Sequence, residues 1–197
     1  LVLEAKRGNI YDRNGVLLAG NRLTYQVQMT YVNRPQQYRD DMYLRLITLL
    51  EENNEIYINE LERFITPAIQ WGSNFREDEN GTKKTAWIKS IITDKTDREK
   101  INTARDAFEY LKDVVFELSD TYTEEEAYKI MILRYATRQN GLSTIVPMTI
   151  AEDVSEETME AIEANHFQFP GISTEEAYVR HYYYPELTSH IIGYIRG

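Results

Sequence analysis

The nine residues LTYQVQMTY, Leu23–Tyr31, alternate apolar and polar side chains at every position. Successive side chains of a β-strand point to opposite faces, so a period of two predicts a strand with one buried and one solvated face. One strand or hairpin is marginal in water, and the rest of the chain must therefore supply partner strands.

A charged stretch, RGNIYDRNG (Arg7–Gly15), precedes this strand. Gly8–Tyr11 and Val16–Ala19 are β-like runs on either side of Asp12–Gly15. Because Asn and Gly both tolerate positive φ, as a primed turn demands, the stretch predicts a β-hairpin with a primed turn. Its two glycines lack the spacing of a dinucleotide or Walker loop and no helix follows, which excludes a phosphate cradle.

Helical spacing appears after the strand. Pro35 suits a first helical turn, and the apolar pattern after it predicts a helix over about residues 36–52. Thr96 with Glu99 and Thr123 with Glu126 fit the capping box and predict two more amphipathic helices. Their apolar faces carry Ile101, Ala104, Phe108, Leu111 and Val115 in the first and Ala127, Ile130, Met131 and Leu133 in the second, which Gly141 ends.

The remaining segments complete the expected fold. Residues 55–95, with Trp71, Phe75 and Trp87 around a polar stretch, predict a short helix and then a loop or exposed hairpin. The later segments are a β-like run over Ser143–Ile150, an acidic helix from Ser155 to about Asn165, strand-like Gly171–Ile172 and Ala177–Tyr184, and a helix over Leu187–Ile195. Together they predict an α+β fold in which mixed β-sheet or hairpin elements from the two chain ends pair around a central helical region.

Composition narrows the functional classes. The 197 residues carry a formal net charge of -10, and no basic stripe offsets it, so nucleic acid is not expected as a partner. The chain has no Cys, which excludes disulfides, thiolate nucleophiles and Cys-type zinc sites. No segment has the roughly 20 apolar residues of a membrane span. Because the chain begins at Leu1 instead of Met, we expect it to be a fragment of a longer protein.

Catalytic motifs are missing from the sequence. No Ser has a Lys three residues later, no Gly-x-Ser-x-Gly elbow occurs, and Lys84-Thr85-Ala86 lacks the glycine of a Lys-Thr-Gly motif. His181, Glu186 and His190 offer one conceivable metal site, with ordinary hydrogen-bonded packing as the commoner alternative. The acidic pairs stand mainly at helix starts, where they complement the helix dipole. We therefore expect no cofactor and no metal.

A dense aromatic segment, Arg180–Pro185, lies near the end of the chain. Tyr and Arg are frequent in protein interfaces, so it is a candidate contact surface. A second interpretation, in which every other ring faces the core, has equal weight.

Several motifs, in their order and spacing, resemble one family. Arg7–Ala19 resembles the opening motif of the N-terminal non-catalytic module of class B penicillin-binding proteins, the cell-wall transpeptidases. Phe169–Ile172, Arg180–Pro185 and His190–Tyr194 are similar to its second motif, although here an extra aromatic residue precedes Pro185 and Glu186 follows it. Val146–Ser155 resembles the stretch before that motif. Residues 55–120 carry no recognisable family motif and are expected to form a helical insertion or head subdomain.

The resemblance implies a pedestal, or dimerisation, domain over residues 1–197 without catalytic activity of its own. It implies a parent D,D-transpeptidase on the outer face of a bacterial membrane, held by a helix before Leu1. The implied partners are the parent's own transpeptidase domain, a SEDS-type glycosyltransferase and other cell-wall synthesis proteins, with a homodimer also possible. The rival hypotheses are a stand-alone surface interaction or sensor domain, and an enzyme using carboxylates or His190.

The predicted site residues have structural or interaction roles. The side chains of Arg7, Asp12 and Arg13 are expected to clasp the hairpin by bidentate pairing with the second-motif segment or the catalytic domain, with Glu186 as one candidate partner. The full predicted set is Arg7, Gly8, Asp12, Arg13, Gly15, Arg180, Pro185, Glu186, His190 and Gly193.

Overall fold

The computed structural model describes residues 7–75 and 78–184, which form one antiparallel sheet and a set of helices. The predicted α+β class is confirmed. The elements in chain order are β1 (Ile10–Tyr11), β2 (Leu17–Met29), α1 (Gln36–Glu52), η1 (Glu60–Arg63), η2 (Ser73–Phe75), α2 (Thr82–Ile91), α3 (Lys95–Arg98), α4 (Ala104–Tyr110), the π-helical η3 (Leu111–Val115), α5 (Glu124–Asn140), β3 (Met148–Val154), α6 (Glu156–Ala164), η4 (His166–Gln168) and β4 (Ile172–Tyr182).

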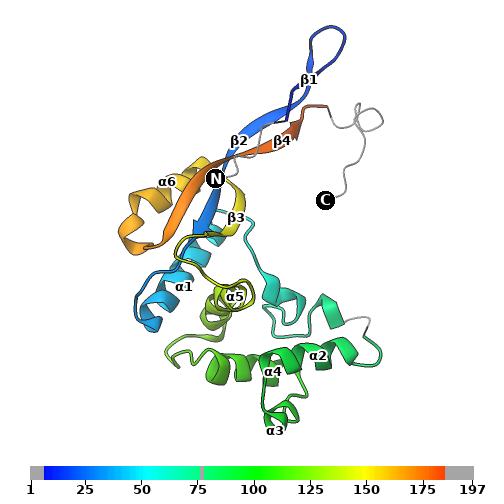
Figure 1. The fold of residues 1–197 in the computed structure, drawn as a ribbon, viewed down its shortest axis with the longest axis vertical. Coiled ribbons are helices and arrows are strands. Elements are labelled where there is room, and N and C mark those ends of the chain that lie inside the picture. The colour runs from blue at the N-terminus through cyan, green and yellow to red at the C-terminus, as the bar shows by residue number, and fades with distance from the viewer. Residues whose placement is uncertain (1–6, 76–77, 185–197) are drawn as a thin grey trace.

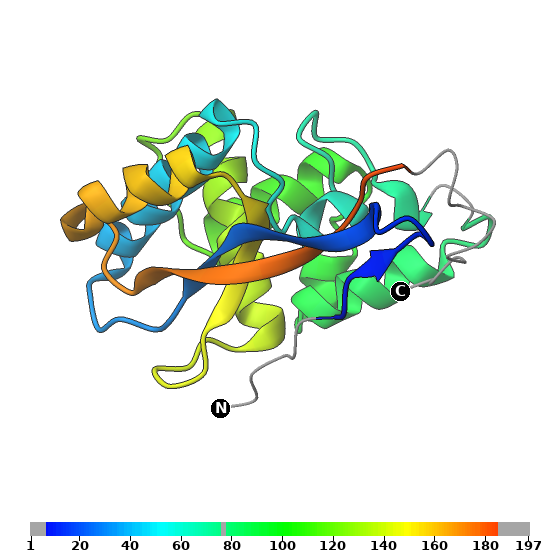
Figure 2. The same cartoon turned by 90° about the horizontal axis from the view of Figure 1, so that it is seen from above.

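Strand β2 is the centre of the sheet. It joins two of the predicted β-runs into one strand and pairs with β4 without interruption from Ala19↔Tyr182 to Met29↔Ile172. The two ends of the chain therefore pair, as predicted. On the other edge of β2, β1 pairs at one end and β3 at the other. Figure 1 shows the long β2–β4 ribbon projecting from the helices to the β1 turn at its tip, and Figure 2 shows the two strands side by side from above. We call residues 7–23 and 178–184 the arm.

The alternation predicted for Leu23–Tyr31 holds only in part. Val27 and Met29 are fully buried, as predicted, whereas Leu23 is 44% exposed. Thr24 and Gln28, predicted to face solvent, are buried. The Thr24 hydroxyl donates to the Asp153 carboxylate and the Val154 carbonyl of β3, and the Gln28 amide donates to Glu175 of β4 at 3.0 Å. The pattern thus identifies the strand correctly and misplaces the limit of its buried face.

Two hydrophobic clusters make up the core. The first joins β2, α1, β3 and α6 around Val27, Leu46 and Ile162. The second joins the helices around Trp87 and Phe108. Helix α5 serves both, because Leu133 belongs to the first cluster and Met131 to the second. Burying one such side chain contributes about 1.5–3 kcal/mol, so each cluster holds its own elements together.

The helix predicted to start at Thr96 with Glu99 is wrong. Asp94 caps the short α3 instead, by accepting from the backbone N–H of Thr96 at 2.7 Å. The chain then restarts at Thr103, whose hydroxyl and the Asp106 carboxylate form a capping box that begins α4. Asp94 and Thr103 each accept amide hydrogens at a helix start. Because two cap residues lie close together in the sequence, the chain forms two short helices where one was predicted.

Helix α2 replaces a predicted loop or hairpin. Asp78 supplies its start by accepting from the backbone N–H groups of Thr82 and Lys84, each at 3.0 Å. Gly81, with φ +64°, makes the left-handed step into the helix. The buried face consists of Trp87, Ile88 and Ile91. The polar side chains of the first turn concealed this apolar face in the sequence.

The other helix predictions are confirmed where the structure describes them. Helix α1 occupies residues 36–52, and the Thr123–Glu126 capping box opens α5, which ends before Gly141. Ser155 caps α6. The helix predicted over Leu187–Ile195 lies outside the described residues.

Glu55 extends the cap of α6 from a distant part of the chain. Its Oε1 accepts from the Ser155 N–H at 3.0 Å, the Ser155 hydroxyl at 2.5 Å and the Thr158 hydroxyl at 2.7 Å. Burial alone would raise the pKa of Glu55, but these hydrogen bonds outweigh it and lower the pKa. The ionised carboxylate is thus the form that holds α6 against the segment after α1.

Replacing Glu55 with Gln keeps an acceptor and removes the charge. We expect the free energy of unfolding at neutral pH to fall by about 1 kcal/mol, allowing for solvent screening. Since the folded-state pKa is lowered, this contribution is present above the unfolded-state pKa and is lost as pH falls through the folded-state value. Urea unfolding of both proteins at neutral and acidic pH should show the difference disappearing in acid; an equal difference at both pH values would contradict it.

Candidate interaction surface

The turn at the tip of the arm is built by Asp12. Its Oδ1 accepts from the backbone N–H groups of Asn14 at 2.8 Å and Val16 at 2.7 Å, and its own N–H donates to the Val16 carbonyl. Within the turn only Gly15 has positive φ, at +82°. The predicted primed turn is therefore wrong: the Asp12 side chain stabilises a longer turn that one left-handed glycine closes.

Two side chains tie the start of the described chain to the arm. Arg180 Nη1 on β4 donates to the Gly8 carbonyl at 2.7 Å, and Asn21 Nδ2 on β2 donates to the Arg7 carbonyl at 2.7 Å. Asn21 and Arg180 are register partners, so one rung of the β2–β4 ribbon holds the segment that leads into β1. Gly8 of the opening motif and Arg180 of the second motif are therefore in contact, and the bond is made to a main-chain carbonyl.

The predicted site residues fall into three groups. Arg7 and Gly8 lie beside Arg180, whereas Asp12, Arg13 and Gly15 lie together at the tip. Across residues 7–75 and 78–184, neither Arg7 nor Arg13 forms an ion pair, and the Asp12 carboxylate serves its own turn. The second-motif residues Pro185, Glu186, His190 and Gly193 lie outside the described residues, so the pairing with Glu186 stays a prediction.

Asn21 was not among the predicted residues. Its partner is a backbone carbonyl on another strand, which no side-chain pattern can indicate. The only sequence signal is its position between two β-like runs.

The arm presents apolar and aromatic side chains to solvent. Ala19, Leu23 and Val27 share one face of β2. Val27 is buried in the first cluster and Ala19 is buried within the arm, whereas Leu23 between them is exposed. The apolar face of the sheet therefore continues beyond the helices onto the arm. The large apolar and aromatic side chains of the arm that are exposed to solvent are Ile10, Tyr11, Val16, Leu23, Tyr178, Tyr182, Tyr183 and Tyr184. For the aromatic segment, the contact-surface alternative is the one that these exposures favour.

A polar cluster fixes the base of the arm. Arg22 Nη2 donates to both oxygens of Asp153, at 2.6 and 2.8 Å, and the Thr24 hydroxyl donates to Oδ1 at 2.8 Å. Asp153 has φ +56° at a register shift between β2 and β3, which turns its side chain toward β2. Burial raises its pKa, but the bonds from Thr24 and Arg22 prevail and lower the pKa.

The glycine of the Phe169–Ile172 motif has a steric role. Gly171 has φ +81°, and a Cβ there would lie 2.6 Å from Val32 Cγ1 and 2.8 Å from the Thr30 carbonyl oxygen. Its own carbonyl accepts from the Thr30 N–H at 2.8 Å. Only glycine fits a left-handed step at this separation, and this contact aligns β4 with the end of β2.

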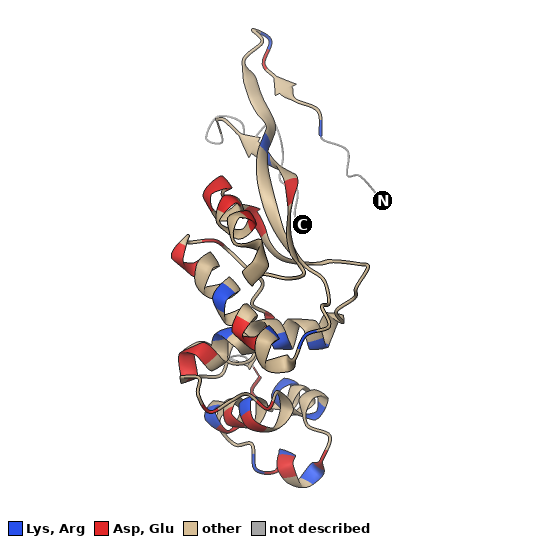
Figure 3. Cartoon of the chain, turned by 90° about the vertical axis from the view of Figure 1, so that its left-hand side faces the viewer, with Lys and Arg blue, Asp and Glu red and all other residues tan. Residues whose placement is uncertain are grey.

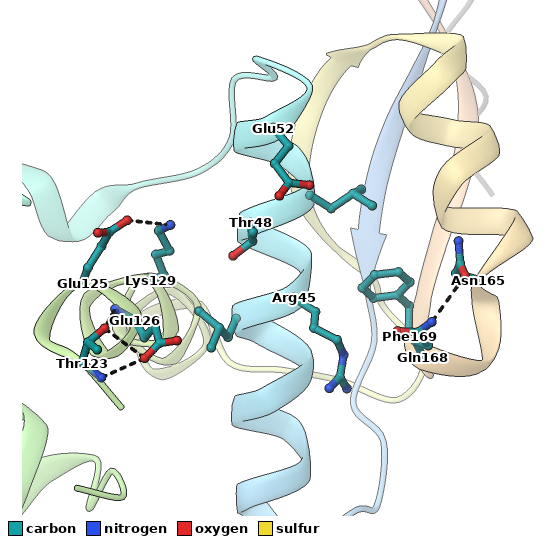
Figure 4. A pocket seen from close by; sticks show the side chains of 12 residues that line it. Arg45, Thr48, Glu52, Thr123, Glu125, Glu126, Lys129, Asn165, Gln168 and Phe169 are labelled. Atoms are coloured by element: carbon teal, nitrogen blue, oxygen red, sulfur yellow. Dashed lines mark hydrogen bonds and ion pairs between the residues drawn. The ribbon is translucent and has the colours of Figure 1, made fainter. Parts of the chain in front are cut away.

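A groove of about 600 Å³ separates α1 from the start of α5 and from η4 (Figure 4). It contains both signs of charge, from Arg45, Glu52, Glu125, Glu126 and Lys129. Lys129 lies 2.9 Å from both Glu51 and Glu125, whose hydrogen bonds and charges raise the pKa of its ammonium group. Its cation is thus neutralised within the protein, and the groove shows no preference for a charged ligand.

Charge is distributed unevenly over the molecule. Figure 3 shows the carboxylates mainly on the helices and few charges along the arm. Among residues 7–75 and 78–184, no three His, Cys, Asp or Glu side chains are grouped to bind a metal. Two members of the conceivable His181, Glu186, His190 site lie outside that range. None of the described helices combines the length and apolar character needed to cross a membrane.

The Arg180 contact can be tested directly. Replacing Arg180 with Ala should release the segment before β1 and lower the free energy of unfolding by about 0.5–1 kcal/mol, because the hydrogen bond is exposed. Amide exchange at residues 8–11 should become faster. A lysine at position 180 is the matched control for charge; if Arg180→Ala leaves exchange in β1 unchanged, the contact does not hold the hairpin.

Comparison with known proteins now identifies the family. The family model for the Penicillin-binding Protein dimerisation domain matches residues 2–197. No curated protein sequence matches the chain.

Three solved structures are similar at low identity. Penicillin-binding protein 2B of Streptococcus pneumoniae strain 5204 has 20% identity and a TM-score of 0.46, covering 98% of this chain and 28% of that one. The strain R6 protein has 20% identity and a TM-score of 0.40, covering 90% and 25%. Penicillin-binding protein PBP2 of Helicobacter pylori, solved in complex with MreC, has 18% identity and a TM-score of 0.40, covering 98% and 22%.

The chain thus spans about a quarter of the length of these proteins. The family match, by contrast, extends over nearly the whole chain and includes both motifs that meet at Arg180. On that match, this chain belongs to the penicillin-binding protein dimerisation domain family.

Proposed function

We propose that the chain is the non-catalytic scaffold and partner-interaction module of a bacterial cell-wall D,D-transpeptidase. The parent would cross-link peptidoglycan and be the target of penicillin. The observation that carries the proposal is the arm, whose apolar sheet face continues past the helices to the exposed Leu23 and Ile10. Exposed apolar surface of this kind marks an interaction site.

The arm is suited to contact the transpeptidase domain of the parent. The β4 strand ends on the arm at Tyr182, so chain after the described residues leaves from this region. Antiparallel pairing along β2 and β4 makes the arm a stiff spacer that sets the distance between that domain and the helices. The parent would stand on the outer face of the membrane, held by an N-terminal membrane helix.

The helices supply a second surface at the other end of the molecule. Residues 55–120 form most of the second hydrophobic cluster, which supports a head subdomain in this range. We assign this end to other cell-wall synthesis proteins, including a SEDS-type glycosyltransferase, or to a second copy of the chain.

Fluorescent penicillin separates the scaffold from an enzyme. The 197-residue chain should stay unlabelled, and the full-length parent should be labelled covalently at a serine outside this chain. Labelling of the chain itself, or failure to label the parent, would contradict the proposal.

The arm contact is tested in the full-length parent with Leu23→Asp, which places a charge on the exposed apolar face. We expect the transpeptidase domain to be cleaved more rapidly in limited proteolysis. Val114→Asp is the matched control, since Val114 is exposed on η3 in the helical part of the molecule. Equal proteolysis of both variants would mean that the arm does not hold the catalytic domain.

A stand-alone surface interaction or sensor domain is the alternative. It would use the same exposed arm for a different partner. The gene sequence on either side of these residues distinguishes the two hypotheses. An upstream membrane helix and downstream Ser-x-x-Lys, Ser-x-Asn and Lys-Thr-Gly motifs would support the transpeptidase scaffold. Their absence would support the stand-alone domain.

A further inference from the structure

A small pocket of about 330 Å³ lies between the start of α1 and the later turns of α5. Three arginines line it, Arg39 from α1 and Arg134 and Arg138 from α5, together with Gln36 and Tyr31. None of its lining residues, all within the described part of the chain, is Asp or Glu. This composition is unusual in a chain with 32 acidic and 22 basic residues.

The three guanidinium groups are not equally compensated. Arg134 Nη1 donates to both oxygens of Asp40, at 2.9 and 3.2 Å, and its Nη2 donates to the Phe116 carbonyl. Asp40 is 3% exposed and is not among the residues that line the pocket; its charge attracts Arg134 first and Arg39 more weakly. One carboxylate thus offsets one of the three positive charges.

Arg39 and Arg138 form no ion pair with any described carboxylate. Arg39 donates through Nη2 to the Gln36 side chain and lies 5.3 Å from the Tyr31 ring, and its buried Nε has no hydrogen-bond partner among the described residues. Arg138 makes one long bond, 3.4 Å, to the Ile91 carbonyl. Two cations therefore face a pocket that contains no anion.

The start of α1 adds to this positive potential. Pro35 precedes the helix without a side-chain cap, and the first turn has no acidic residue. The N-terminal amides of a helix carry a partial positive charge that favours an anion. Gln36, the first residue of α1, lies in the pocket lining, so the helix start and the arginines act on the same space.

We propose that this pocket binds a carboxylate side chain of an acidic peptide segment from a partner protein. A guanidinium presents paired N–H donors that match the two oxygens of a carboxylate, and charge-assisted bonds of this kind are the strong ones. The volume of about 330 Å³ is sufficient for a carboxylate side chain. The inference that the acidic segment comes from a partner protein rests on the proposed partner-interaction function. The grooves beside α5 differ, because Glu125 and Lys129 line both and neutralise each other.

Binding of a fluorescein-labelled hexaglutamate peptide to the 197-residue chain tests the proposal, with hexaglutamine as the matched probe. We expect saturable anisotropy for hexaglutamate alone, weakening as salt is raised. The double substitution Arg39→Gln/Arg138→Gln should raise the Kd about tenfold or more, since each loses a charge-assisted bond. Arg134 is left intact because removing it would strand Asp40.

Arg45→Gln/Arg63→Gln removes the same charge elsewhere and is the control. Equal weakening in this control would mean general charge attraction and would overturn the pocket. If hexaglutamine binds as tightly as hexaglutamate, the pocket does not recognise a carboxylate. If millimolar inorganic phosphate displaces the labelled peptide as effectively as free glutamate does, the pocket binds anions in general and the proposed carboxylate ligand is wrong. Thermal unfolding of each variant shows whether it is folded. Because penicillin labelling of the parent does not involve this pocket, failure of one proposal is distinguishable from failure of the other.

Discussion

Replacing Asp40 with alanine is expected to lower the free energy of unfolding by about 3–5 kcal/mol. Asp40 is 3% exposed and accepts from Arg134 Nη1 and from Gln36 Nε2 at 2.8 Å. The substitution would leave Arg134, whose side chain is only 16% exposed, as a buried cation without its carboxylate. Urea unfolding at neutral pH measures the loss.

The matched control is Asp120→Ala. Asp120 pairs with Lys112 at 3.3 Å, but its side chain is 97% exposed, and the expected change is below about 1 kcal/mol. A loss at Asp40 no larger than the loss at Asp120 would contradict the prediction.

The pair itself is not expected to be a net source of stability. Burial raises the pKa of Asp40 even though Arg134 and Gln36 act to lower it, so the cost of desolvation exceeds the attraction. The double substitution Asp40→Leu/Arg134→Met should therefore be far less destabilising than Asp40→Ala. The role of the pair is then to specify how α1 and α5 meet.

Replacing Trp87 with alanine is expected to lower the free energy of unfolding by about 3–5 kcal/mol. Trp87 is 5% exposed, its ring stacks on Phe64 with centroids 5.0 Å apart, and its Nε1 donates to the Tyr135 hydroxyl at 3.0 Å. The substitution would open a cavity and leave that hydroxyl without its donor. Calorimetry or urea unfolding measures the effect.

Amide exchange in the same variant tests the proposed head subdomain. If residues 55–120 unfold separately, Trp87→Ala should accelerate exchange in α2 and α4 and leave the β2–β4 ribbon protected. Leu46→Ala, in the first cluster, is the control and should do the reverse. Uniform acceleration in both variants would mean that the two clusters unfold as one unit.

Local sequence signals predicted much of the fold. Thr123 with Glu126 and Ser155 each accept from amides within one helical turn, so the residues that start α5 and α6 lie together in the sequence. The period of two located β2 because half-buried strands alternate. The same reasoning failed at Thr96, because Asp94 caps the helix two residues earlier by accepting from the amides of Thr96 and Asp97, and at α2, whose start depends on Asp78.

The interaction surface was less predictable, for a physical reason. Arg180 was identified as a site residue, but its partner is the main-chain carbonyl of Gly8, which no side-chain pattern indicates. Asn21 likewise donates to a carbonyl, and every residue offers one. The exposed state of Leu23 depends on where the helices end against the sheet, which is a property of packing between distant segments.

The pairing of β2 with β4 also constrains the order in which the protein can fold. The helices need only neighbouring residues, whereas β2 must wait for a partner from the far end of the chain, and such long-range pairing is slow. Until β3 and β4 have been synthesised, the two-residue β1 is the local partner of β2, and most of both edges of this long, partly apolar strand is unpaired. We expect the arm to form late and to be prone to aggregation until β4 is available to pair with β2.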